Sequence, residues 1–123
     1  MTDTTVSPAR VLVVEDQYLI RMMLEDMLAD LGHDVAAAVG TMPEASEQAR
    51  NGDFHVAILD VNVDGEQIFP VADIIAERGL PFVFATGYGE HSLPDAYRGC
   101  PTLLKPFQAS QLADMLTKLL ATA

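Results

Sequence analysis

The feature that most constrains the fold is a short apolar run near the N-terminus that has no polar face. Residues 11–14 read Val-Leu-Val-Val, and two acids, Glu15 and Asp16, follow them. A strand with one face in solvent alternates apolar and polar residues, whereas a strand of a parallel sheet is buried on both faces and is apolar throughout. The run over residues 10–14 therefore predicts a buried parallel strand.

Helical patterns alternate with similar runs along the rest of the chain. Apolar residues recur at helical spacing from Ile20 to Leu31, and Gly32 is placed to end that helix. The same patterns predict strands over 34–39, 56–59, 82–85 and 102–104, and helices over 42–50, 69–77 and 112–120. Residues 90–98 could form a short helix or a loop, because Pro94 interrupts them. Five strand–helix units predict an α/β fold with an open, doubly wound parallel sheet covered by helices on both faces.

Length and composition indicate one domain. The chain has 123 residues, half of them apolar, and we expect a leader over 1–8 and a folded domain over 9–121. The formal net charge of -11 argues against direct nucleic-acid binding, because such a protein must approach a phosphate backbone. Cys100 is the only cysteine, and the sequence contains neither a signal-peptide pattern nor an apolar stretch of membrane-span length. A cytoplasmic protein without a membrane partner is expected.

Polar residues follow the predicted strands where such a sheet usually binds its ligand. Ligands of open parallel sheets gather outside the carboxyl ends of the strands. Those ends carry Glu15, Asp16, Asp60, Thr86 and Lys105. Three neighbouring carboxylates oppose one another's ionisation, so a divalent cation is expected among them. Mg²⁺ suits a small open site, because it takes one or two protein carboxylates and keeps several waters.

The same residues suit phosphoryl transfer. In that reaction the protein mainly positions the reactants and supplies positive charge to the phosphoryl oxygens. Asp60 is the candidate nucleophile, while Lys105 and Thr86 are candidates to contact the phosphoryl group. Asn62 and Gly87 could add main-chain N–H donors. A single acid at a strand end is usually a solvated turn residue. A functional role for Asp60 is favoured because Glu15, Asp16, Thr86 and Lys105 stand at the ends of other predicted strands.

These residues carry a resemblance to a known family. The matching positions are the Glu15-Asp16 pair, Asp60, Thr86 and the triplet Lys105-Pro106-Phe107. In this order they resemble the response-regulator receiver domain of two-component signalling, and the resemblance covers nearly the whole chain. It implies a flavodoxin-like fold with five parallel strands in the order 2-1-3-4-5.

The resemblance also implies a set of roles. Asp60 would accept a phosphoryl group from a sensor histidine kinase or a phosphotransfer protein. Mg²⁺ would be bound by Asp16, Asp60 and the main-chain carbonyl of Asn62, with Glu15 acting through water. Such a stand-alone receiver would catalyse only its own phosphorylation and dephosphorylation. It would signal through an unidentified downstream protein or act as a phosphate sink.

A narrower resemblance lies around the fourth strand. Residues 84–88, Phe-Ala-Thr-Gly-Tyr, resemble the signature of the FAT GUY receivers, a subfamily known from alphaproteobacterial regulators. Most receivers have Tyr or Phe three residues before the lysine, where this chain has Thr102. An aromatic rotamer switch at that position is therefore excluded, and the subfamily is also described as lacking it. The loop over 61–65 lacks the usual proline and is short, as in the subfamily.

Other functions fit parts of the pattern. An EF-hand loop starting at Asp60 would need Glu at its twelfth position, which is Val71 here. A phosphatase of the haloacid-dehalogenase type would need a second Asp where Asn62 stands. A phosphohydrolase acting on external substrates and a receiver-like module that binds partners without phosphorylation are the alternatives to a phosphorylated receiver.

Two further groups of side chains have simpler interpretations. Tyr18 and Met22 lie off the core stripe of the first helix, so they could form a kinase-docking face or be ordinary exposed residues. His33, His55 and His91 have no metal-ligand spacing and are expected to be structural or solvated.

Overall fold

The computed structural model describes residues 8–88 and 93–122. The elements in chain order are β1 (Arg10–Val14), α1 (Tyr18–Asp30), β2 (Asp34–Val39), α2 (Met42–Asn51), β3 (Val56–Asp60), β4 (Asn62–Val63), β5 (Glu66–Gln67), α3 (Phe69–Glu77), β6 (Phe82–Thr86), η2 (Asp95–Tyr97), β7 (Thr102–Leu104) and α4 (Ala109–Thr122). The leader predicted over 1–8 lies outside the described residues apart from Pro8. In the part of the chain that the structure describes, no helix has both the length and the apolar character of a membrane span.

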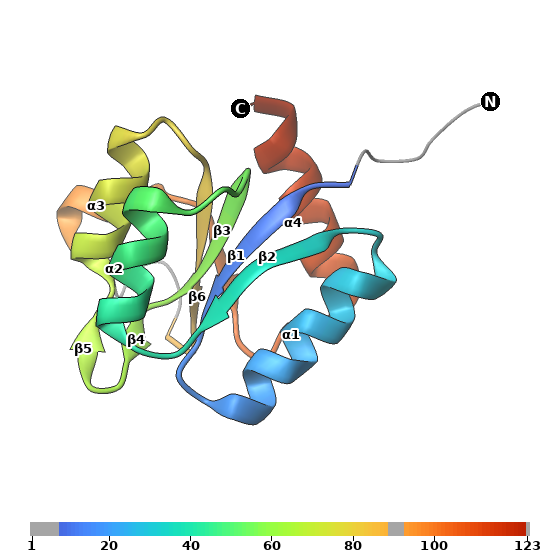
Figure 1. The fold of residues 1–123 in the computed structure, drawn as a ribbon, viewed down its shortest axis with the longest axis horizontal. Helices are drawn as coiled ribbons and strands as arrows, with labels where there is room; N and C mark the ends of the chain where they lie inside the picture. The colour runs from blue at the N-terminus through green and yellow to red at the C-terminus, as the bar shows by residue number, and fades with distance from the viewer. Residues whose placement is uncertain (1–7, 89–92, 123) are drawn as a thin grey trace.

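Five of the strands form one parallel sheet. Their order is β2-β1-β3-β6-β7, and every neighbouring pair is parallel. Counted within this sheet, β6 and β7 are the fourth and fifth strands, so the predicted order 2-1-3-4-5 is confirmed. Helices α1 and α4 cover one face and α2 and α3 cover the other (Figure 1). This is the predicted doubly wound α/β architecture.

The sheet separates two cores, and alternate residues of each strand enter opposite ones. Leu12 and Val14 of β1 pack in the core beneath α2 and α3. Val11 and Val13 pack in the core beneath α1 and α4. All four are at most 1% exposed, so the strand is buried on both faces as its sequence predicted. Burial of about 25 cal/mol per Å² of apolar surface makes these two layers the main stabilising contribution to the fold.

A small hairpin, β4–β5, follows β3 and was not predicted. The two strands are antiparallel and two residues long, and they are joined at Asp64 and Gly65. Both turn residues have positive φ, 52° and 84°, as a type I′ turn requires. The dipeptide Asp-Gly is a preferred sequence for this turn, so the short loop has a defined geometry.

The segment that the sequence left open contains one turn of 3₁₀ helix in its described part. This turn, η2, ends at Tyr97, whose ring stacks on Phe69 with 4.7 Å between centroids. The same ring meets the edge of Phe84 in β6, and its hydroxyl donates to the carboxylate of Asp73 in α3. These contacts attach the connection between β6 and β7 to α3.

Four exposed arginines bond to nearby main-chain or carboxylate oxygens. Arg78 donates to the carbonyls of Ala49 and Gly52 at 2.7 and 2.9 Å, which ties the end of α3 to the end of α2. Further pairs are Arg10 with the carbonyl of Asp53, Arg50 with the carbonyl of Ser46, and Arg98 with the carboxylate of Asp95. The carboxylates of Asp53 and Asp95 are themselves about nine-tenths exposed. The basic and acidic members of these contacts thus both lie at the surface.

The histidines at the amino ends of the strands have structural roles, as expected for His33 and His55. Nδ1 of His33 accepts a hydrogen bond from the amide of Ala9 at 3.1 Å, and Nδ1 of His55 accepts one from the amide of Arg10 at 2.9 Å. Each bond requires an unprotonated nitrogen. His91 lies outside the described residues.

His33 should make the protein sensitive to acid. Burial lowers the pKa of His33 from its ordinary value of 6.5, with a smaller opposing effect of Asp34. The unfolded chain therefore binds this proton more readily, and stability falls as the pH drops below about 6.5. The variant His33→Asn keeps an acceptor for the amide of Ala9. Between about pH 7.5 and pH 5, we expect its melting temperature to fall less than that of wild type. Equal losses in thermal melts would contradict this role of His33.

Candidate functional site

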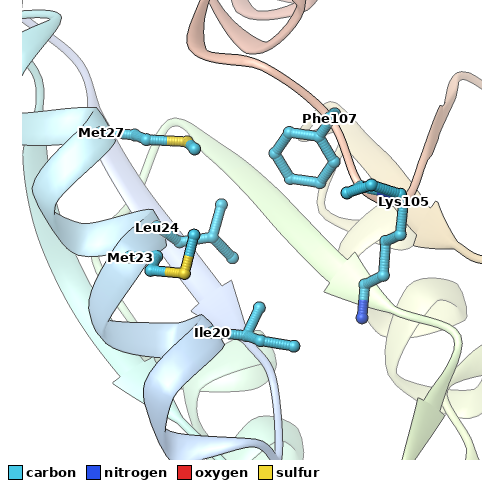
Figure 2. Close-up of a pocket in the computed structure, with 7 residues that line it drawn as sticks. Ile20, Met23, Leu24, Met27, Lys105 and Phe107 are labelled. Atoms are coloured by element: carbon cyan, nitrogen blue, oxygen red, sulfur yellow. The ribbon is translucent and has the colours of Figure 1, made fainter.

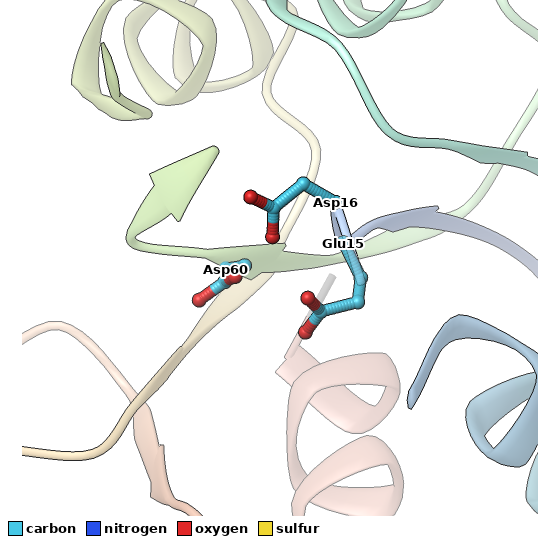
Figure 3. Close-up of side chains that lie close together, drawn as sticks. All are labelled: Glu15, Asp16 and Asp60. Carbon is cyan, nitrogen blue, oxygen red and sulfur yellow. The ribbon is translucent and has the colours of Figure 1, made fainter. Parts of the chain in front are cut away.

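Four neighbouring strands bring the predicted polar side chains to one edge of the sheet. Asp60 and Thr86 are the last residues of β3 and β6, Glu15 and Asp16 follow β1, and Lys105 follows β7. Figure 3 shows the three carboxylates at the adjacent ends of β1 and β3. Two of them, Asp16 and Asp60, border a hollow of about 260 Å³, whose other lining residues are Gln17, Val61, Asn62, Thr86, Gly87, Tyr88 and Lys105.

The three acids form one cluster. An oxygen of each of Glu15, Asp16 and Asp60 lies within 4.8 Å of the others. Glu15 is buried, at 1% exposure, whereas Asp16 is exposed. Burial and then the negative charge of Glu15 raise the pKa of Asp60 from its ordinary value of 3.8 to about 6, against the opposing effect of Lys105. The site therefore disfavours the ionised carboxylate that nucleophilic chemistry at Asp60 would need.

Lys105 provides the positive charge that faces these acids. Its Nζ lies 2.8 Å from Oε1 of Glu15 and 3.2 Å from Oδ1 of Asp60. Burial alone would lower the pKa of Lys105, but the hydrogen bond to Glu15 and the charges of Asp60 and Glu15 outweigh it and raise the pKa. Lys105 is therefore a permanent cation, in contact with two of the three carboxylates.

The donor set fits a hard divalent cation. Three carboxylates with one ammonium leave an excess of negative charge, and carboxylate oxygens are the ligands that Mg²⁺ prefers. Asp16 and Asp60 line the hollow, whereas Glu15 is already bonded to Lys105 and to the amide of Gln17. The first two are therefore better placed to bind an ion directly. A ligand role for the main-chain carbonyl of Asn62 stays a prediction.

Thr86 and the two predicted amide donors lie at the same edge. Thr86 is 3% exposed, and its Oγ1 accepts a hydrogen bond from the amide of Tyr88 at 3.1 Å. This bond uses an oxygen lone pair and leaves the hydroxyl hydrogen able to donate to a ligand. Asn62 and Gly87 both line the hollow and are exposed, so their amides are near the space that a phosphoryl group would fill.

Sequence reasoning missed two main-chain donors that orient the acids. The amide of Asp64 donates to Oδ2 of Asp16 at 2.8 Å, and the amide of Gln17 donates to Oε2 of Glu15 at 3.0 Å. The hairpin turn brings Asp64 to Asp16, so the Asp64-Gly65 dipeptide was a usable signal for the first contact. The second contact depends on the rotamer of Glu15 and leaves no signature in the sequence.

An apolar surface begins beside the hollow. Tyr18, Leu19, Met22 and Met23 of α1 are exposed by 62, 71, 41 and 56%. Next to them, a groove of about 300 Å³ runs between α1 and the segment after β7, where Phe107 faces the helix (Figure 2). The groove is lined by Ile20, Met23, Leu24, Met27, Lys105, Pro106 and Phe107. Lys105 is common to the groove and the hollow, so the two are adjacent.

Comparison with known proteins agrees with this geometry. Residues 11–117 match the family model of the response regulator receiver domain. PdtaR, a transcriptional regulatory protein of Mycobacterium tuberculosis, is 34% identical over 111 residues, which are 85% of this chain and 53% of PdtaR. The chain thus spans about half the length of this curated relative.

Solved structures of two proteins are similar over most of the chain. SdrG from Sphingomonas melonis Fr1 is 42% identical with a TM-score of 0.81, covering 94% of this chain and 99% of SdrG. SdrG has also been solved in a BeF3-activated conformation, with a TM-score of 0.78. The receiver domain of the sensor histidine kinase PA1611 from Pseudomonas aeruginosa has a magnesium ion coordinated in its active site cleft. At 21% identity and a TM-score of 0.80 it supports the fold alone.

The raised pKa of Asp60 predicts how stability changes with pH in the absence of metal. The folded protein binds this proton more tightly than the unfolded chain does, so the stabilisation is present at low pH and is lost as the pH rises through about 6. Asp60→Asn removes the ionisation. Without Mg²⁺ we expect the variant to be more stable than wild type at about pH 7.5, by on the order of 2 kcal/mol. The difference in free energy of unfolding between the variant and wild type should narrow towards about pH 5. A difference that does not change with pH, measured by chemical denaturation, would contradict a raised pKa of Asp60.

Proposed function

This chain belongs to the response regulator receiver domain family, and on that premise we propose that Asp60 accepts a phosphoryl group from the phosphohistidine of a sensor histidine kinase or phosphotransfer protein. The family places the chain among two-component signalling regulators and not among metabolic enzymes. One observation carries the proposal: Asp60 ends a buried strand in a hollow where the ammonium of Lys105 lies 3.2 Å from its carboxylate.

The proposed reaction is a displacement at phosphorus. A carboxylate oxygen of Asp60 forms the new P–O bond while the P–N bond of the phosphohistidine breaks, and the bonding pair leaves with the imidazole. The product is an aspartyl phosphate. Its hydrolysis, with water as the nucleophile, regenerates the carboxylate and releases inorganic phosphate.

The other residues of the hollow act on the phosphoryl oxygens. The ammonium of Lys105 already contacts the Asp60 carboxylate and offsets the negative charge that arrives with the phosphoryl group. The hydroxyl of Thr86 and the amides of Asn62 and Gly87 donate hydrogen bonds to the remaining oxygens. Mg²⁺, when bound by Asp16, Asp60 and the carbonyl of Asn62 with Glu15 acting through water, supplies charge neutralisation to the same oxygens.

We further propose that the chain is a FAT GUY receiver and signals without an aromatic on β7. Support comes from residues 84–88 and from Thr102, which is paired in register with Phe84. The amide of Lys105 donates to the carbonyl of Thr86 at 2.8 Å, so displacement of either residue is passed to the other strand. Phosphorylation adds about -1.5 to -2 charge at Asp60, which is enough to shift such a coupled pair of strand ends.

The partners we propose are proteins. The phosphorylated chain changes its contacts with a downstream protein or removes phosphoryl groups from its kinase as a sink, and neither role requires nucleic-acid contact by this domain. Tyr18 and Met22, on the exposed apolar surface of α1 beside the hollow, form part of the kinase-docking face. We propose a cytoplasmic location, which suits a domain spanning residues 9–121 with a single cysteine.

Phosphoryl uptake should depend on Asp60. With Mg²⁺ and a small phosphodonor, we expect the intact mass of wild type to rise by one phosphoryl group and that of Asp60→Asn to stay unchanged, because an amide cannot form the acyl phosphate. Thr86→Ala should still be phosphorylated but more slowly. Uptake by Asp60→Asn equal to wild type would refute the assignment. Sustained turnover of many equivalents of a phosphate ester would instead favour a phosphohydrolase.

Substitutions in the docking face should slow phosphotransfer only when the donor is a protein. We expect Tyr18→Ser with Met22→Ser to slow phosphotransfer from a cognate kinase roughly tenfold, because exposed anchors of this kind carry much of an interface's affinity. The rate with a small phosphodonor should be unchanged, because neither side chain lines the hollow. A matched double substitution on the opposite layer, Glu47→Ser with Asn51→Ser in α2, should leave both rates unchanged. Equal slowing with both donors would indicate damage to the site and not loss of docking.

A further inference from the structure

We propose that Arg21, on the first helix, is a positioning residue that fixes the main chain from which the metal-binding acids project. The inference rests on the proposed function, because it concerns the Mg²⁺ site used there. Nη1 of Arg21 donates to the main-chain carbonyl of Glu15 at 2.8 Å. Arg21 touches none of the carboxylates in any described contact, so its effect on the site passes through the peptide between Glu15 and Asp16.

The main chain at Glu15 is anchored on both of its polar groups. Its amide donates to the carbonyl of Val39, at the end of β2, at 3.0 Å. Its carbonyl accepts from Arg21. The peptide unit that joins Glu15 to Asp16 is planar. A fixed direction of the Glu15 carbonyl therefore also fixes the orientation of the Asp16 amide. The neighbouring strand and the first helix together set the direction of Asp16, while the amide of Asp64 orients its carboxylate.

Gly40 provides the space that the guanidinium occupies. A β-carbon at Gly40 would lie 2.5 Å from Nη1 of Arg21, closer than any real contact, and 3.3 Å from the carbonyl oxygen of Glu15. The φ of Gly40 is not in the left-handed region, so an alanine is acceptable to the backbone and the conflict is only with these atoms. An alanine at residue 40 would therefore force Nη1 of Arg21 to move from its present position beside the Glu15 carbonyl.

The guanidinium also suits this role chemically. It stays protonated at every relevant pH, and its planar fork can hold a main-chain acceptor in one direction. Its carbon lies 5.5 Å from the centre of the exposed Tyr18 ring, a weak cation–π contact at the surface, so the hydrogen bond to Glu15 is the contact that holds the guanidinium in place. Second-layer contacts of this kind commonly change metal affinity by about ten- to a hundredfold when they are removed.

The experiment is a titration of Mg²⁺ into the full chain, followed by the amide signals of the site in ¹H–¹⁵N spectra. We expect Arg21→Met to weaken Mg²⁺ binding roughly tenfold and Arg21→Lys, which keeps a donor and the charge, to recover part of the loss. Gly40→Ala should weaken binding in the same direction. If Gly40→Ala acts by displacing Arg21, the double variant Arg21→Met with Gly40→Ala should bind no more weakly than Arg21→Met alone.

Measuring the stability of these variants without metal distinguishes a positioning role of Arg21 from a general structural role. An Mg²⁺ dissociation constant unchanged in Arg21→Met and Gly40→Ala would overturn the proposal, even if both variants melted earlier. A wild type that binds no Mg²⁺ would overturn it as well. Failure of the proposed function has a different signature: wild type would bind Mg²⁺ normally yet gain no phosphoryl mass at saturating Mg²⁺. Should Arg21→Met fail to fold, Gly40→Ala and Arg21→Lys still test the contact.

Discussion

The contact between Lys105 and the acids of β1 and β3 is the interaction on which the site depends. Lys105 follows the edge strand of the sheet, and it reaches an acid that is 90 residues away in sequence. Without this ammonium, Glu15 would be a carboxylate at 1% exposure with the amide of Gln17 but no positive charge beside it, a costly arrangement in a protein interior. The cation thus makes a buried acid tolerable and at the same time faces the carboxylate that we assign as the phosphoryl acceptor.

The acid cluster and the cation balance each other incompletely, and this imbalance is useful. Lys105 contacts Glu15 and Asp60 but leaves Asp16 exposed at the rim of the hollow. A fully neutralised cluster would have little affinity for a divalent ion, and a cluster without the lysine would repel the phosphoryl group more strongly. In the function that we propose, one ammonium for three carboxylates would permit both a metal and a phosphate in the same small space.

The parts of the fold that were predictable are those with a repeated pattern. Residues 11–14 are apolar without alternation because both faces of β1 are buried, and this implied a parallel sheet. Glu15, Asp60, Thr86 and Lys105 each directly followed a predicted strand, and parallel strands end at one edge. The convergence of Asp60, Thr86 and Lys105 therefore followed from the topology and needed no knowledge of side-chain rotamers.

The parts that were not predictable depend on contacts between single side chains. Strands of two residues, such as β4 and β5, are too short to show a period, although Asp64-Gly65 was a signal for the turn. Which carbonyl Arg21 reaches, and why residue 40 has no side chain, became visible only once α1 and the end of β2 were placed side by side. Similarly, nothing in the sequence paired Tyr97 with Asp73.

The excess of acidic over basic residues has a consequence for the phosphoryl donors that the proposed function can use. With 18 acidic residues against 7 lysines and arginines and a net charge of -11, the electrostatic field around the protein is negative. Such a field lowers the local concentration of small phosphorylated anions within a Debye length, about 10 Å at 0.1 M salt. A protein donor that carries its own cations is not excluded in this way. For the function that we propose, this negative charge would therefore favour phosphoryl transfer from a dedicated kinase over transfer from small metabolic phosphoryl compounds.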